Sequence, residues 1–178
     1  SASAAGTGGS ITDDFASGAD NWKTLTGAWA VADGVYQQSD AAGYDLISQL
    51  NKAVPATYDI SVKMRAGGDK LGAGLMLGQP QSGTRNGATL IDITDGSYLR
   101  WGAYGDGGTY GFVGGNGLPG TAVKGEWHTL KVSVQEKKTV IFWDDKNIGE
   151  IDAIAKGGVG LVTSVSSTDF DDFTVKAR

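Results

Sequence analysis

The sequence predicts an all-β fold in which two antiparallel sheets pack face to face as a sandwich. From Ile11 onward, apolar and polar residues alternate with a period of two, the pattern of strands with one buried face. Polar turn signals recur roughly every 8–12 residues, a spacing typical of sandwiches. The chain holds 29 glycines and only 3 prolines, and the glycines fall between the alternating segments, where turns and bulges use them.

The chain divides into a short tail and one domain. Residues 1–10 (SASAAGTGGS) are small, uncharged and rich in Gly and Ser, which is typical of a linker. Residues 11–178 show no second boundary and no repeat, and their length is ordinary for one domain with a buried core. The linker composition predicts neighbouring domains of a parent protein as partners.

Strands are predicted where the alternation is clearest, at residues 58–65, 98–104 and 130–135. A last strand is expected at residues 170–175 (FDDFTV), with Asp171 on the side of Phe173 and Asp172 on the other. Turns are expected between strands at residues 32–34, 67–69, 95–96, 136–138 and 144–147.

Composition excludes several classes of function. The net charge is -5 without a basic stripe, which argues against nucleic acid as a partner. There is no polybasic patch and no apolar run near the roughly 18 residues that a membrane span needs, so no membrane partner is expected. The absence of cysteine rules out disulfides and cysteine-ligated metals.

Several segments together carry a family resemblance. They are TGAWAVADGVYQQS, YDISVKMRAGGDKLGAGLMLG, SYLRWGAY, GEWHTLKVSV, VIFWDDKNIGEI, GVGLVTS and FDDFTV. From about Asp13 to Val175 the chain resembles the concanavalin A-like (laminin-G-like) lectin and glucanase domains. Within that group it is similar to bacterial fructan-type carbohydrate-binding modules and to the 3-keto-disaccharide hydrolase domain. The resemblance implies an all-β, two-sheet antiparallel jelly-roll sandwich.

The resemblance further implies a non-catalytic, lectin-like module that binds a poly- or oligosaccharide, secreted or at the bacterial cell surface. Two alternatives stay open: a calcium-binding structural or adhesion domain, and a glycoside hydrolase of the same fold. Residues 150–155 (EIDAIA) resemble the catalytic E-I-D-x-x-E strand of jelly-roll glucanases, but Ala155 replaces the acid/base carboxylate. The sequence therefore predicts no catalytic residues.

Aromatic rings stack on the C–H faces of sugars, and polar side chains bind the hydroxyls. Tyr98, Arg100 and Tyr104 share one face of a predicted strand, which a glycine-rich loop follows. The alternative is that the tyrosines are ordinary cross-strand partners, and a weaker candidate loop contains Tyr44 and Asp45. The predicted ligand-binding residues are Arg85, Asn86, Tyr98, Arg100, Tyr104, Asp106, Tyr110 and Asn116.

Two acidic clusters suggest a calcium site, because Ca²⁺ prefers several hard oxygen ligands. If the first and last strands are neighbours, the clusters meet, and their like charges favour a cation. The alternative is that each carboxylate caps a turn. The predicted ligands are Asp13, Asp14, Asp169, Asp171 and Asp172. His128, the single histidine, is expected to be structural.

Overall fold

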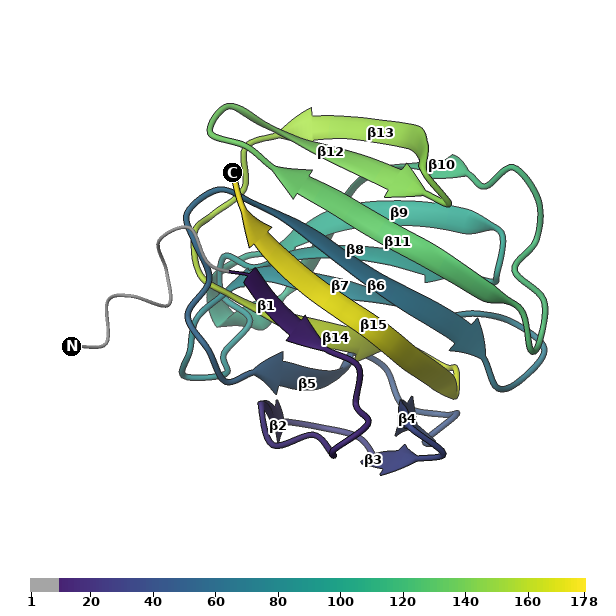
Figure 1. Ribbon diagram of the computed structural model, residues 1–178. Coiled ribbons are helices and arrows are strands. Elements are labelled where there is room, and N and C mark those ends of the chain that lie inside the picture. The colour runs from purple at the N-terminus through teal and green to yellow at the C-terminus, as the bar shows by residue number, and fades with distance from the viewer. Residues whose placement is uncertain (1–9) are drawn as a thin grey trace.

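The computed structural model describes residues 10–178, which form two stacked antiparallel sheets (Figure 1). The predicted all-β sandwich is thereby confirmed. Residues 1–9 of the predicted linker lie outside the described residues, and Ser10 already belongs to the first strand. Across the eight-stranded sheet the order is β13 (Lys146–Asp152), β12 (Lys138–Trp143), β11 (Trp127–Val134), β6 (Tyr58–Ala66), β15 (Thr168–Ala177), β4 (Val35–Gln38) and β3 (Trp29–Ala32), while β1 (Ser10–Asp13) also pairs with β15.

The second sheet has seven strands. Its order is β10 (Tyr110–Gly117), β9 (Tyr98–Tyr104), β8 (Thr89–Thr94), β7 (Ala73–Gln79), β14 (Gly158–Thr163), β5 (Leu46–Leu50) and β2 (Trp22–Thr24). A 3-10 turn, η2 (Asp106–Gly108), connects β9 to β10. No helix within residues 10–178 is long and apolar enough to cross a membrane.

The main core lies between the sheets and follows from the alternation in sequence. On β6, Ile60, Val62 and Met64 are completely buried, whereas the residues between them are partly or fully exposed. Leu75 and Leu77 of β7 belong to the same apolar cluster. Burial of this apolar surface is the main stabilising term for such a sandwich.

Three of the five predicted turns contain an aspartate that adopts left-handed backbone angles. Asp33, Asp95 and Asp144 have φ of 53°, 52° and 48°. Tight two-residue hairpin turns require positive φ, which Asp tolerates better than most residues. This local chemistry explains why the turn positions could be predicted.

A β-bulge alters the last strand. The pairing of β15 with β6 shifts between Asp171 and Thr174, and Asp172 has φ of 46°. As a result Phe170 and Phe173, three residues apart, are both fully buried. The prediction that Asp171 shares the side of Phe173 is therefore wrong, because the extra residue places Phe170 there instead.

A second apolar cluster lies on the outer face of the seven-stranded sheet. Its buried members are Ile47, Met76, Ala88, Leu90, Tyr104 and Val162. Leu25 and Tyr110 pack against it and remain partly buried. The middle of this face is thus filled by the protein's own side chains, and binding is left to its margins.

Candidate functional site

The outer face of the seven-stranded sheet carries a buried ion pair between two neighbouring strands. Asp92 on β8 lies opposite Arg100 on β9, and the guanidinium donates from Nε to Oδ1 over 2.8 Å and from Nη2 to Oδ2 over 3.3 Å. Asp92 is 1% exposed, and burial raises the pKa of its carboxyl group to about 6, against the opposing effect of Arg100. The guanidinium carbon of Arg100 also lies 5.1 Å from the ring centroid of Tyr110.

A second polar centre forms around Asp45. Its Oδ2 accepts hydrogen bonds from Arg85 Nη1 at 3.0 Å and from the Tyr104 hydroxyl at 2.8 Å, and its Oδ1 accepts one from Ser164 Oγ at 3.2 Å. Burial raises the pKa of Tyr104, so the phenol stays a neutral donor. Arg85 in turn lies over the Tyr104 ring, 5.0 Å from its centroid. These contacts fix the side chains without help from a ligand.

Beside these two centres is a pocket of about 360 Å³, here called the Arg100 pocket. Tyr44 and Val165 are 78% and 50% exposed. Lys70 and Asp95, which form an exposed pair at 3.6 Å, also belong to its wall. The complete lining is Tyr44, Lys70, Leu71, Gly72, Thr94, Asp95, Arg100, Ser164 and Val165.

Tyr98 extends the polar and aromatic surface next to this pocket. It is directly opposite Thr94, a pocket residue, and is 37% exposed. Its ring lies against Gly115 of β10, where a Cβ atom would come within 2.5 Å of the ring carbon Cε1 and closer still to the Leu99 carbonyl oxygen. Any larger residue at position 115 would collide with its neighbours, so this glycine permits the placement of the Tyr98 ring.

The structure brings five of the eight predicted ligand-binding residues to one face: Arg85, Tyr98, Arg100, Tyr104 and Tyr110. Tyr104 is only 2% exposed and is therefore closed to ring stacking in this structure.

The other three lie elsewhere. Asn86 and Asp106 are exposed near the opposite end of β9, where the Asn86 carboxamide approaches Gly108 of η2. Asn116 is turned toward β13 and donates from Nδ2 to the Ile148 carbonyl over 2.7 Å. They do not join the Arg100 pocket.

Several site residues were missed in the sequence, among them Asp92. It sits within LIDIT, a strand segment otherwise buried and apolar, where a carboxylate needs a partner. A carboxylate in a buried strand could therefore have been recognised in the sequence as needing a partner. That this partner is Arg100 follows only from the pairing of β8 with β9. The remaining missed residues of the site are Lys70, Thr94, Asp95, Ser164 and Val165.

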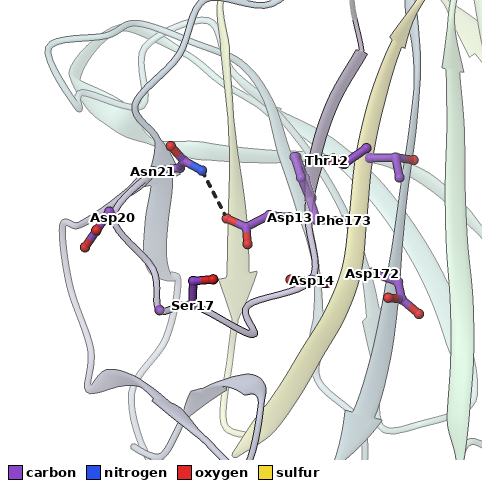
Figure 2. Close-up of a pocket in the computed structure, with 10 residues that line it drawn as sticks. Thr12, Asp13, Asp14, Ser17, Asp20, Asn21, Asp172 and Phe173 are labelled. Carbon is purple, nitrogen blue, oxygen red and sulfur yellow. Dashed lines mark hydrogen bonds between the residues drawn. The ribbon is translucent and has the colours of Figure 1, made fainter.

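The predicted acidic clusters meet in part. β1 pairs with β15, as expected, with Asp13 opposite Phe173. A pocket of about 710 Å³ at this junction is lined by Asp13, Asp14, Asp20 and Asp172, together with residues of the 17–21 loop. Figure 2 shows Asp13 turned toward Asn21, with Asp172 on the other side of the β15 ribbon.

Three of these carboxylates, Asp13, Asp14 and Asp172, already have a partner. Asp13 accepts hydrogen bonds from the Phe15 backbone N–H at 2.9 Å and from Trp22 Nε1 at 2.8 Å. Asp14 accepts one from the Ala16 N–H at 3.0 Å. Asp172 lies 2.9 Å from Lys63 Nζ. These contacts are those of turn caps and ion pairs.

Asp169 and Asp171 behave differently from each other. Asp169 accepts two hydrogen bonds at Oδ2, from Arg65 Nε over 2.9 Å and from Arg65 Nη2 over 2.8 Å, away from the junction. Burial raises the pKa of Asp171, and the charges of Asp172 and Asp14 act in the same direction. Within residues 10–178, no three acidic or histidine side chains are arranged to hold a metal ion together. The calcium site stays a prediction.

The segment that resembles a glucanase strand lies on the other sheet. Glu150 belongs to β13, an edge strand, and its carboxylate is 3.4 Å from Lys138 Nζ on β12. It lies on the sheet opposite the one that carries the Arg100 pocket. Only Glu150–Asp152 of this segment belong to β13, and residues 153–155 follow the end of the strand.

No family model matches the sequence, and no curated protein matches it either. Solved structures do share its fold. The carbohydrate-binding module CBM66 from Bacillus subtilis superposes with a TM-score of 0.75 at 17% identity, covering 88% of this chain and 96% of that one. The apo Crh5 transglycosylase gives a TM-score of 0.72 at 13% identity, covering 97% and 86%. A Bacillus subtilis protein with a galectin-like fold gives 0.71 at 11% identity, covering 94% and 96%. The chain therefore shares the all-β, two-sheet jelly-roll fold of these structures, as its sequence segments predicted.

Proposed function

We propose that the protein is a non-catalytic carbohydrate-binding module that holds a glycan in the Arg100 pocket and against Tyr98. One observation carries the proposal: a pocket built on a prearranged Arg100–Asp92 pair is bordered by exposed tyrosine rings. The shared fold with a structure named as a carbohydrate-binding module supports it.

The chemistry of the pocket suits a neutral, polyhydroxylated ligand. Tyr98 and Tyr44 offer ring faces, while Thr94 and Ser164 supply hydroxyl groups. The nearby charges occur as opposite pairs: Arg100 with Asp92, Arg85 with Asp45, and Lys70 with Asp95. Because these pairs cancel, the site has no strong preference for a charged ligand.

The described lining of the Arg100 pocket holds no pair of carboxylates, which favours binding over hydrolysis at this pocket. Most glycosidases place two carboxyl groups across the scissile bond, about 5–10 Å apart. Among the described residues that line the Arg100 pocket, Asp95 is the single carboxylate. Asp92 is buried and paired with Arg100, and Asp45 already accepts three hydrogen bonds. A glycoside hydrolase remains the alternative, and transglycosylases also share the fold.

The proposed partners and location follow from the proposed carbohydrate-binding function. A module of this kind acts next to other domains of a parent protein and outside the cell, where polysaccharides are found. Secretion or display at the cell surface is therefore part of the proposal.

The first test is a glycan array combined with thermal melts in the presence of soluble neutral polysaccharides. Ligand that binds only the folded protein raises its melting temperature, and reducing-sugar release should stay at background. A positive array with no sugar release supports a binding module. Binding to no glycan overturns the proposal, and sugar release lost upon a single Asp or Glu substitution replaces it with the hydrolase.

A further inference from the structure

His128 lies between two carboxylates at the start of β11. Its Nδ1 is 2.6 Å from Asp144 Oδ2, and its Nε2 is 3.0 Å from Glu126 Oε1. The ring stacks on Trp143 with centroids 4.9 Å apart, and only 14% of the side chain is exposed. The imidazole is thus confined, with one carboxylate beside each nitrogen.

The hydrogen bonds around Asp144 define where the proton on Nδ1 points. Asp144 Oδ1 accepts a hydrogen bond from the Thr129 backbone N–H at 2.8 Å, so the carboxylate is held as an acceptor. Nδ1–H of His128 therefore donates to Oδ2. In a neutral imidazole, Nε2 then carries a lone pair and can only accept.

That lone pair would face a carboxylate. Glu126 Oε1 is the charged neighbour of Nε2, and no group within residues 10–178 satisfies Nε2 with a well-aligned hydrogen bond. Two acceptors at this separation repel each other, whereas an imidazolium attracts both Glu126 and Asp144. With a proton on each nitrogen, the imidazole can bridge the two carboxylates.

Glu126 ends a loop that reaches the Arg100 pocket. In this loop, residues 118–126, Ala122 N–H donates to the Gly96 carbonyl over 2.7 Å and Leu118 N–H donates to the Ser97 carbonyl over 2.8 Å. Gly96 N–H donates to Leu71, a residue of the Arg100 pocket, over 2.9 Å. The loop therefore runs from His128 to the β8–β9 turn beside the pocket.

We propose that His128 is a pH-sensitive latch: its imidazolium clamps Glu126 and with it residues 118–126, and loss of the proton releases this loop. Histidine is the side chain that ordinarily changes charge between about pH 5 and 8. The charged groups around the ring are Glu126 from the loop, Asp144 from the β12–β13 turn and Lys146 from β13. On β6 its partner is Met64, which is uncharged. Any effect of the latch on glycan affinity rests on the proposed function.

Amide hydrogen exchange followed by NMR tests the latch without a ligand. We expect the protection of the Ala122 and Leu118 amides, which donate to the β8–β9 turn, to fall about three- to fivefold between about pH 5 and about pH 8 after correction for intrinsic exchange. Because the chain has one histidine, its ring signals report a single titration. The midpoint of that titration should coincide with the loss of protection.

Two variants and one matched control decide the result. Glu126→Gln should give low protection at both pH values, and His128→Gln should do the same. Glu150→Gln removes an equally exposed carboxylate (55% for both glutamates) from an edge strand and should behave as wild type. The latch is overturned if amide protection in the wild type does not depend on pH. It is also overturned if Glu126→Gln shows the same fall in protection between the two pH values as the wild type.

The test of the latch does not depend on the folding of His128→Gln. If that variant does not fold, amide protection in the surface variant Glu126→Gln still tests the latch. A chain that binds no glycan at any pH overturns the proposed function, whereas the exchange data judge the latch independently.

Discussion

Arg100 and Asp92 face each other on neighbouring strands, with Nε 2.8 Å from Oδ1, and the carboxylate beneath the guanidinium is 1% exposed. Arg100 lines the Arg100 pocket, and Asp92 holds its guanidinium in place. Burying a charge is tolerated only when a partner compensates for it. Removing one partner should therefore cost much more than removing both.

We expect Arg100→Met to lower the free energy of unfolding by about 2–4 kcal/mol, because Asp92 is left buried and unpaired. The double variant Arg100→Met/Asp92→Leu should recover most of this loss, since it replaces both charges with apolar groups. Urea denaturation of the wild type, both single variants and the double variant measures the coupling. Simple additivity of the two single effects would contradict a buried pair.

The pKa of Asp92 predicts a pH dependence of stability. Burial raises it to about 6, above the value of an unfolded aspartate. Between about pH 4 and about pH 6 the folded state holds a proton that the unfolded state has released. The contribution of this group to stability is therefore largest at the acidic end and falls as the pH rises to about 6, by on the order of 2 kcal/mol.

Denaturation of the wild type and of Asp92→Asn across this pH range isolates the contribution of Asp92. The free energy of unfolding of the wild type minus that of Asp92→Asn should fall as the pH rises from about 4 to about 6. Above about pH 7 this difference should no longer depend on pH. A difference that is independent of pH would show that Asp92 titrates normally in the folded protein.

If a glycan is found, Tyr98→Ala and Tyr44→Ala should each weaken its binding by about five- to thirtyfold, because each removes a ring face at the pocket. Phe142→Ala is the control, since Phe142 is a partly buried ring on the other sheet, beside Lys131. Isothermal titration calorimetry measures the three affinities. Equal effects of all three variants would argue against a site at the Arg100 pocket.

The calcium prediction can be tested by melting. If calcium binds between β1 and β15, it should raise the melting temperature relative to EDTA by linkage, and magnesium should do so less. Asp14→Asn should abolish the shift, whereas Asp169→Asn should not, because Asp169 is paired with Arg65. An unchanged melting temperature would favour the turn-cap interpretation of these carboxylates.

Parts of the candidate site could be predicted because they depend on local sequence. Period-two alternation placed Tyr98 and Arg100 on one face of a strand, and the ring and guanidinium types suggested sugar contacts. The same reasoning expected Tyr104 to be available. The structure buries it instead, because its hydroxyl donates to Asp45, which is 59 residues away in sequence.

Four of the strands, the aspartate turns and the sandwich could be predicted, because alternation and turn chemistry act over a few neighbouring residues. Only the tertiary structure decided which polar groups meet. Asp45 contacts Arg85, which is 40 residues away in sequence, and Ser164, which is 119 residues away. The order of the strands in the sheet brings these residues together, and no local sequence pattern indicates it. The bulge in β15 was likewise hidden, since one extra residue changes the side of every side chain before it. Local interactions therefore set the secondary structure, while the packing of distant strands set the site.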